Sequence, residues 1–194
     1  TRVTYRAPKP VREVSFLSHD KLTPGATDDR WLYLPATRKV RRVPASDRGD
    51  YFLGTDFSYE DMQSELKFAL QDYEFTLLES GETKQAGHYR LRGTPKNRGT
   101  VRELGYGAFE ASIDPATWMP TQIDFFDPKL KPLKTVEVSG VKKIDGVWNA
   151  GTIKCTNHRS GHSTVFNFSG IEYRSGLPDK LFLPAALSRG APQL

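Results

Sequence analysis

Three side chains that zinc accepts as ligands lie close together in the stretch CTNHRSGH: Cys155, His158 and His162. Their C-x2-H-x3-H spacing could hold a metal on one side. A structural zinc site needs a further ligand, however, and the chain has no second cysteine. The three residues also span the turn expected between two long strands, where a histidine is often simply exposed. We therefore predict no metal site, with partial zinc ligation as the alternative.

Neighbouring carboxylates could divide the roles of acid and base in a hydrolysis, and they occur at Asp28-Asp29, at Glu60-Asp61 and at Asp124 with Asp127. The first pair follows a Pro-Gly turn, and the second stands at an expected helix start, where the helix dipole favours acids. The sequence contains no nucleophile elbow, no phosphate-binding glycine loop and no His-Glu zinc helix. We therefore predict a protein that is not an enzyme and uses no cofactor, with a hydrolase that uses Asp or His residues as the alternative.

A basic run, Arg38 to Val43, follows Trp31 and Tyr33, and this combination could grip phosphates and stack on unpaired bases. In a strand, successive side chains point to opposite faces, so the positive charge of RKVRRV is split between two faces. The pattern favours an edge strand with solvated charges, which also discourages edge-to-edge aggregation. Nucleic acid is therefore not an expected partner.

The composition is that of a folded protein. The 194 residues are 37% hydrophobic, 26% charged and 11% aromatic, which suits a single antiparallel domain over residues 1–194 with a core rich in rings. The net charge of +5 favours acidic partners such as anionic headgroups, although a solvated surface explains it equally well. No stretch approaches the ~18 apolar residues of a membrane-spanning helix. Because the chain begins at Thr1, we expect that a preceding segment, with any targeting signal, is missing.

Short segments rich in Val, Thr, Phe and Tyr alternate with Gly, Pro, Asp and Asn, a pattern typical of an antiparallel meander. Ser139-Gly140 and Asp145-Gly146 supply hairpin turns, so Lys134 to Asn157 is predicted to form a three-stranded meander. The polar stretch 94–100 is predicted to be an exposed loop. The predicted strands are 3–6, 13–19, 30–34, 38–43, 73–79, 87–92, 102–106, 108–113, 119–126, 134–138, 140–144, 147–157 and 163–173.

One helix is expected to interrupt the sheet after Ser58, which could cap it, with Glu60 and Asp61 in its first turn. Its apolar stripe, expected to lie against the sheet, consists of Met62, Leu66, Ala69 and Leu70. A second short helix is predicted near residues 178–187.

Several predicted strands place large apolar groups on both faces. Trp31 and Tyr33 alternate with Leu32 and Leu34, and Phe125 and Phe126 are consecutive. A sheet packed on one side only would alternate apolar with polar residues. Helices on one face and curling of the sheet would leave a lined concavity, whereas ordinary core packing explains any single ring equally well.

Two segments that follow each other in the sequence, DDRWLYLPATRKVRRV and FLGTDFSYEDM, resemble a signature of the LolA-like outer membrane lipoprotein-sorting protein family. Later segments are similar to the family in the same order: YRLRGTPK, IDPATWMPTQIDFFD, VEVSGVKKIDGVWNA and LPDKLFLPAAL. The resemblance covers nearly the whole chain. It implies a mainly β fold in which a strongly curved antiparallel sheet forms an unclosed half-barrel, with a few helices over the concave face.

The same resemblance implies a periplasmic carrier of Gram-negative bacteria whose apolar cavity takes acyl chains of lipoproteins or of another lipid. It also implies donor and acceptor proteins of the envelope and, at most, peripheral contact with a membrane. A partner-binding or scaffold protein of the cell envelope is the alternative. The early part of the family domain is expected to precede Thr1.

We expect the large apolar side chains of these segments to line the cavity. An acyl chain bound there would gain ~0.8 kcal/mol for each CH2 group that it buries. The predicted lining residues are Trp31, Tyr33, Phe57, Tyr59, Met62, Leu66, Trp118, Phe125 and Trp148. Arg38, Arg41 and Arg42 are predicted to meet anionic headgroups or an acidic partner at the rim. Asp56, Glu60 and Asp61 are interpreted as structural residues that cap a helix and pair with nearby arginines.

Overall fold

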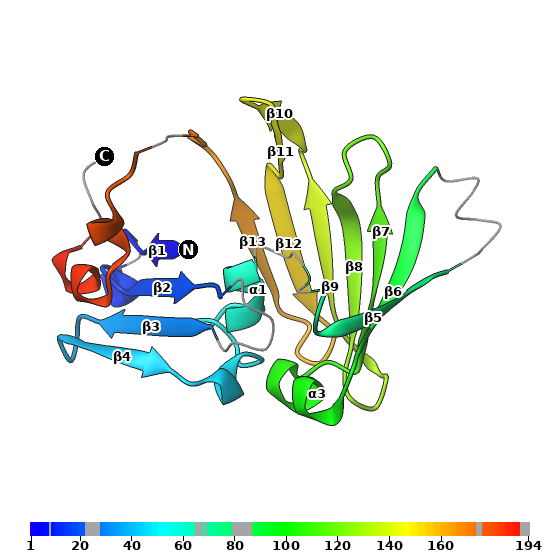
Figure 1. The fold of residues 1–194 in the computed structure, drawn as a ribbon, viewed down its shortest axis with the longest axis horizontal. Coiled ribbons are helices and arrows are strands. Elements are labelled where there is room, and N and C mark those ends of the chain that lie inside the picture. The colour runs from blue at the N-terminus through cyan, green and yellow to red at the C-terminus, as the bar shows by residue number, and fades with distance from the viewer. Residues whose placement is uncertain are drawn as a thin grey trace. The chain divides into compact units, whose positions relative to one another are not determined.

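The computed structural model describes residues 1–7, 9–21, 28–64, 68, 70–78, 87–173 and 176–190. The chain contains two compact units. The smaller consists of Thr1–Asp47 together with Arg174–Leu194, and the larger of Arg48–Tyr173. Figure 1 shows that both are built mainly from antiparallel strands. No helix among the described residues is long and apolar enough to cross a membrane.

The larger unit is a seven-stranded antiparallel sheet in the order β13-β12-β9-β8-β7-β6-β5. Within the described residues the edge strands, β5 and β13, do not pair with each other, so the sheet is an unclosed, curved half-barrel as predicted (Figure 1). The bounds of its strands are β5 Tyr73–Leu77, β6 Tyr89–Pro95, β7 Ala108–Ile113, β8 Pro120–Phe126, β9 Pro132–Ser139, β12 Thr152–Asn157 and β13 Ser163–Asn167.

The two faces of this sheet differ sharply in polarity. Residues directly opposite each other on neighbouring strands share a face. On one face Phe125 stands opposite Phe109 and Lys134, and Val136 opposite Ile123 and Cys155, nearly all of them apolar. The other face carries rows of polar residues: Arg92, Glu110, Asp124 and Thr135 in one row, and Arg90, Ser112, Gln122, Glu137 and Lys154 in the next. The sheet therefore packs on one side only.

Helix α1, Tyr59–Ser64, lies on the concave, apolar side of the sheet (Figure 1). Its start is closed reciprocally: the Asp61 carboxylate accepts from the Ser58 backbone N–H at 2.7 Å, and the Ser58 hydroxyl accepts from the Asp61 N–H at 3.2 Å. The predicted cap is thus confirmed. Of the predicted stripe, Met62 packs against the core, Leu70 is 73% exposed, and Leu66 and Ala69 lie outside the described residues.

Helix α3, Arg98–Leu104, corrects two sequence predictions, the exposed loop at 94–100 and the strand at 102–106. Strand β6 continues to Pro95, and the Asn97 side chain then caps the helix by accepting from the Thr100 N–H at 3.0 Å. The helix ends at Gly105, whose φ of 74° is the left-handed conformation that favours glycine. The two caps override the β preference of Thr100 and Val101.

The predicted meander from Lys134 to Asn157 is wrong in its pairing. Strands β10, Lys142–Ile144, and β11, Val147–Asn149, form a separate two-stranded ribbon, and β12 pairs with β9 beside it. The predicted Asp145-Gly146 turn is confirmed, with positive φ at both residues. The predicted strand 147–157 breaks at Gly151, where a Cβ atom would lie 2.6 Å from the Gly140 carbonyl oxygen.

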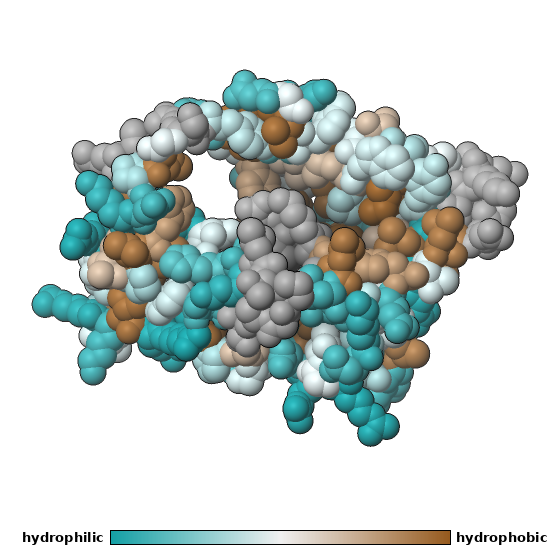
Figure 2. Space-filling view, in the orientation of Figure 1, coloured by the Kyte–Doolittle hydropathy of each residue, from teal (hydrophilic) through white to brown (hydrophobic). Residues whose placement is uncertain are grey.

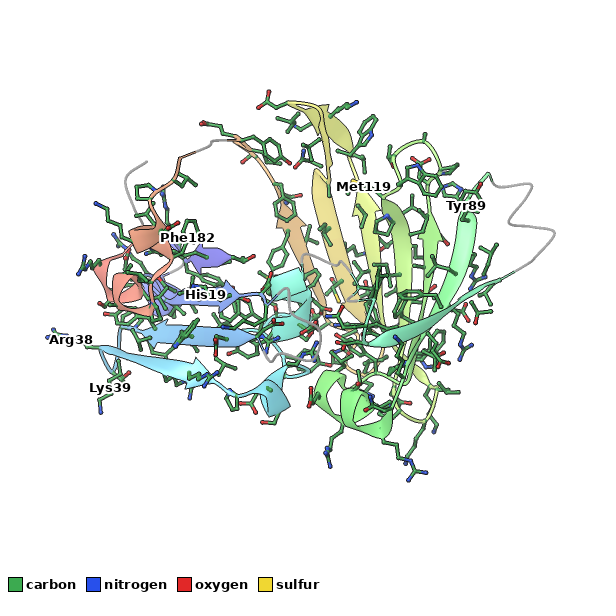
Figure 3. All side chains as sticks on the ribbon, in the orientation of Figure 1. His19, Arg38, Lys39, Tyr89, Met119 and Phe182 are labelled. Carbon is green, nitrogen blue, oxygen red and sulfur yellow. The ribbon has the colours of Figure 1, made fainter. Side chains whose placement is uncertain are left out.

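The smaller unit is a four-stranded antiparallel sheet in the order β1-β2-β3-β4. Its strands are β1 Arg2–Thr4, β2 Ser15–His19, β3 Asp29–Leu34 and β4 Lys39–Val43, and its 3-10 helices are η1 Lys9–Val11, η2 Ala45–Asp47, η3 Asp179–Phe182 and η4 Pro184–Arg189. The helix predicted at 178–187 is therefore two 3-10 turns. Arg2 donates to the carbonyls of Leu181, Ala186 and Gly190, and His19 lies 2.6 Å from the Phe182 carbonyl (Figure 3).

Candidate functional site

The concave side of the larger unit carries a continuous floor of buried apolar side chains. Rings dominate it: Phe68 stacks on Phe109 with centroids 3.6 Å apart, and Phe57 stacks on Phe166 at 4.6 Å. We call this surface the concave apolar face. Its floor consists of Phe57, Tyr73, Tyr106, Phe109, Ala111, Ile123, Phe125, Val136, Val138 and Cys155, with Met62, Phe68, Leu91, Ile113, Ile153 and Phe166 half-buried against it.

The concave apolar face continues outward into exposed side chains at its margins. On the edge strand β5, Phe75 stands opposite Gly93 and Leu77 opposite Leu91, which places both on the same side as the floor. Leu77 is 58% exposed, and Phe75 and Tyr89 are also exposed. At the other edge, Phe168 is exposed beside Phe166. Figure 2 shows apolar residues gathered over this unit. Within the part of the chain that the structure describes, these marginal side chains of the face stay exposed.

One polar cluster is sealed into the floor. The Lys134 ammonium donates to the Asp61 carboxylate and, at 3.2 Å, to the Tyr106 hydroxyl, which donates to Asp61 at 3.0 Å and lies 2.9 Å from the Ser58 hydroxyl. The side chains of Lys134 and Asp61 are 2% and 4% exposed. Burial alone would lower the pKa of Lys134, but the Asp61 carboxylate outweighs it and raises that pKa. Burial also raises the pKa of Tyr106. The cluster fixes α1 to the sheet.

The residues of the CTNHRSGH pattern have separate partners. His158 Nε2 lies 2.8 Å from the Thr135 hydroxyl, and His162 Nδ1 lies 2.7 Å from the Asp56 carboxylate. Cys155 is buried in the floor, where burial raises the pKa of its thiol to about 12. Among the described residues, no three Cys, His, Asp or Glu side chains are placed to hold a metal.

Three of the predicted lining residues lie in or beside the floor. Phe57 and Phe125 are buried in it and Met62 packs against it. Tyr59 is buried separately against Phe52, with ring centroids 5.2 Å apart. Leu66 lies outside the described residues. The structure thus brings Phe57, Met62 and Phe125 together at the floor, and their contact with a ligand stays a prediction.

The other predicted site residues lie elsewhere. Trp118 is in the β7–β8 turn and Trp148 on the β10–β11 ribbon, both exposed. Trp31 and Tyr33 belong to the smaller unit, where Trp31 packs edge-on against His19. Arg38, Arg41 and Arg42 are exposed at the turn and edge strand β4, and Arg42 pairs with Asp29.

Sequence reasoning missed several residues of the floor, notably Phe109, Leu91 and Phe166. A signal for them exists. In YRLRG and AFEASI, apolar residues or glycine alternate with charged or polar ones, which places Tyr89, Leu91 and Gly93 on one face. Lys134 shares the period of Val136 and Val138, so alternation also places it on the inner face. Its partner Asp61 has no comparable local signal.

Known proteins share this sequence pattern and this fold. A family model described as "-like: Uncharacterized protein" matches residues 1–189, whereas none of the curated proteins matches the chain. The structure is similar to a protein from Vibrio parahaemolyticus described as an outer membrane lipoprotein-sorting protein domain, with 30% identity, a TM-score of 0.85 and coverage of 97% of this chain and 77% of that one.

Two further solved structures share the fold. A DUF1329 family protein from Desulfovibrio piger is 28% identical with a TM-score of 0.86, covering 96% of this chain and 75% of that one. A LolA superfamily protein from Nitrosomonas europaea is 22% identical with a TM-score of 0.67, covering 94% and 75%. The last likeness concerns the fold alone.

Proposed function

The chain belongs to the LolA-like outer membrane lipoprotein-sorting protein family, and we propose that it is a non-enzymatic carrier that takes acyl chains of lipoproteins or of another lipid onto the concave apolar face. The observation that carries this proposal is the continuity of that face. Its apolar side chains run from a buried floor to exposed margins at Leu77 and Phe168 without a change of face.

The physical driving force is the removal of hydrocarbon from water. Each CH2 of an acyl chain that leaves water contributes ~0.8 kcal/mol, so one chain that buries about eight methylenes gains about 6 kcal/mol before ordering costs. Exposed apolar margins of this kind mark sites of interaction, and a bound acyl chain would cover them. Covalent chemistry is not required for such a role.

The smaller unit is proposed to meet the partners of this carrier. Its residues 1–47 and 174–194 contain 13 Lys and Arg against 6 Asp and Glu, a net +7, whereas residues 48–173 contain 15 against 17, a net −2. The positive charge of the chain is therefore concentrated in the unit that carries Arg38, Arg41 and Arg42 on its edge. This distribution supports contact with acidic donor or acceptor proteins in the periplasm, through encounter steered by charge.

The test is native mass spectrometry of the purified protein, with extraction and identification of co-purifying lipid, followed by titration with a fluorescent fatty acid. Leu77→Ser on the concave apolar face should weaken uptake. The matched control, Val165→Ser, changes an exposed apolar residue that stands opposite Lys154 on the polar face, and uptake should be unchanged. An empty protein that takes up no fatty acid would refute the carrier and favour a partner-binding scaffold. Equal effects of the two variants on uptake would show that the cargo does not bind to the concave apolar face.

A further inference from the structure

An exposed aromatic pair projects from one end of the half-barrel. Trp118, in the turn between β7 and β8, is 70% exposed, and its ring stacks on Tyr89 at 5.7 Å between centroids and 6° between planes. Tyr89, at the start of β6, is 47% exposed. Figure 3 labels Tyr89 and Met119, the neighbour of Trp118, at this end of the strands. Two large rings thus face water together.

The turn that carries Trp118 is rigid and strained. The Trp118 N–H donates to the Asp114 carbonyl at 2.7 Å, and the Asp114 carboxylate accepts from the Ala116 N–H at 2.9 Å and from the Thr117 hydroxyl at 3.0 Å. The φ of Trp118 is 56°, a conformation that bulky side chains rarely adopt and that costs free energy. The surrounding hydrogen bonds therefore hold the Trp118 backbone in this conformation while its ring stays exposed.

A second projection stands at the same end. Strand register places the β7–β8 turn beside the end of β9, since Ile113 pairs with Pro120 and Gln122 with Glu137, and the β10–β11 ribbon follows β9 directly (Figure 1). Its Val147 and Trp148 are exposed. The Lys143 ammonium lies 5.6 Å from the centre of the Trp148 ring on one face of the ribbon, and Lys142 is exposed on the other face.

We propose that this end of the half-barrel binds the interfacial region of a lipid bilayer that contains anionic headgroups. Trp and Tyr rings prefer the boundary between headgroups and acyl chains, because one part of the ring is apolar and another is polar. Lysines beside them place ammonium groups among phosphates while their aliphatic stems stay with the apolar phase. Asp145 is the only acid of the ribbon 142–149, and the Asp114 carboxylate is occupied within its own turn.

Contact with a bilayer requires no bound cargo and is therefore separate from the carrier role. Two separate projections, each with a tryptophan, form an extended contact surface rather than a pocket. Such a surface suits a lipid bilayer better than a single side chain of another protein. Wherever such a surface docks, the concave apolar face of the same unit is brought near the lipid.

The experiment is flotation of the protein with vesicles of phosphatidylcholine mixed with phosphatidylglycerol and with vesicles of phosphatidylcholine alone. The wild type should float with the anionic vesicles and less with the neutral ones. Trp118→Ser should weaken binding by about tenfold, because one large ring no longer leaves water. Lys142→Gln with Lys143→Gln should remove most of the dependence on anionic lipid and on salt.

Leu130→Ser is the matched control. Leu130 is 54% exposed, has a φ of 59° and lies in the β8–β9 turn at the opposite end of the same strands. Its substitution should leave flotation unchanged, and thermal melts should show that all variants are folded. Equal effects of Trp118→Ser and Leu130→Ser, or no flotation of the wild type, would overturn the proposal. Self-association that is lost in Trp118→Ser without any flotation would assign the surface to a protein contact instead.

The two proposals fail separately. Uptake of a fluorescent fatty acid is measured without vesicles, and flotation is measured without added fatty acid. Intact uptake with no flotation refutes the membrane contact alone, whereas flotation without uptake refutes the carrier alone.

Discussion

The ammonium of Lys134 on β9 lies against the carboxylate of Asp61 on α1, and both side chains are buried in the apolar floor of the half-barrel. The two residues are 73 positions apart in the chain, so their contact defines where the helix sits on the sheet. Replacing a buried ion pair by apolar residues is often neutral, because desolvation offsets the attraction, but removing one partner leaves a buried charge uncompensated.

Asp61→Asn should therefore lower the free energy of unfolding by about 3 to 5 kcal/mol. The asparagine oxygen can still accept from the Ser58 N–H, so the cap is kept, whereas the charge and the oxygen that accepts from the Tyr106 hydroxyl are lost. Denaturation by urea, followed by circular dichroism, measures the change.

Two further variants test the cause of that loss. The double variant Asp61→Leu with Lys134→Met should recover most of the stability. Glu137→Gln, in the exposed pair with Lys154 at 3.2 Å, should cost at most about 1 kcal/mol. A loss at Glu137 equal to that at Asp61 would show that burial is not what makes the Asp61 pair important.

Stability should fall steeply in alkaline solution. Burial raises the pKa of Tyr73, of Tyr106 and, to about 12, of Cys155, and the Asp61 carboxylate raises that of Lys134. In the folded state these groups keep their protons at pH values where the unfolded chain has already lost them. Their contribution to the free energy of unfolding is therefore complete below the ordinary pKa values, which are 9.0 for Cys, 10.0 for Tyr and 10.5 for Lys. Above those values the contribution declines.

The decline should begin near pH 9 and reach about 1.4 kcal/mol per pH unit for each group involved. Urea unfolding at a series of pH values measures it. Tyr106→Phe should make the dependence shallower, whereas Tyr173→Phe, at an exposed ring, should not. A flat stability between pH 8 and pH 11 contradicts the mechanism.

Alternation along the strands is enough to predict the apolar face, because a sheet packed on one side imposes a period of two. The unclosed half-barrel was implied by the family resemblance and not by the alternation. Strand β12 pairs with β9 across an inserted ribbon, and this pairing is not local in the sequence. The close approach of Gly140 to Gly151 that permits it is visible only in the folded structure. Helix α3 was missed because Thr100 and Val101 favour strands and because its caps, Asn97 and Gly105, were not recognised as such. The contact of Lys134 with Asp61 joins distant segments, and local reasoning can identify the inward lysine but not its partner.

Gly93 should tolerate no side chain. It stands opposite Phe109 on β7, and a Cβ atom would lie 2.3 Å from that ring. Because Phe109 is buried and stacked on Phe68, the ring cannot move aside freely. Gly93→Ala should cost about 1 to 3 kcal/mol through overpacking, and adding Phe109→Leu should lessen the effect of the alanine. Purely additive losses in the double variant would mean that the ring is not the obstacle.

Asp56 should matter more for stability than for cargo. Its buried carboxylate accepts from the Thr164 hydroxyl at 2.7 Å and contacts His162, and its N–H donates to the Thr164 hydroxyl at 3.0 Å, so it ties the segment before α1 to the β12–β13 hairpin. Asp56→Ala leaves these partners unsatisfied and should cost about 2 kcal/mol. His162→Ala should cost at most about 1 kcal/mol, since that ring is largely exposed. Thermal melts and fatty-acid titrations on the same samples decide the matter. An unchanged melting temperature with lost uptake in Asp56→Ala would make Asp56 a cargo residue.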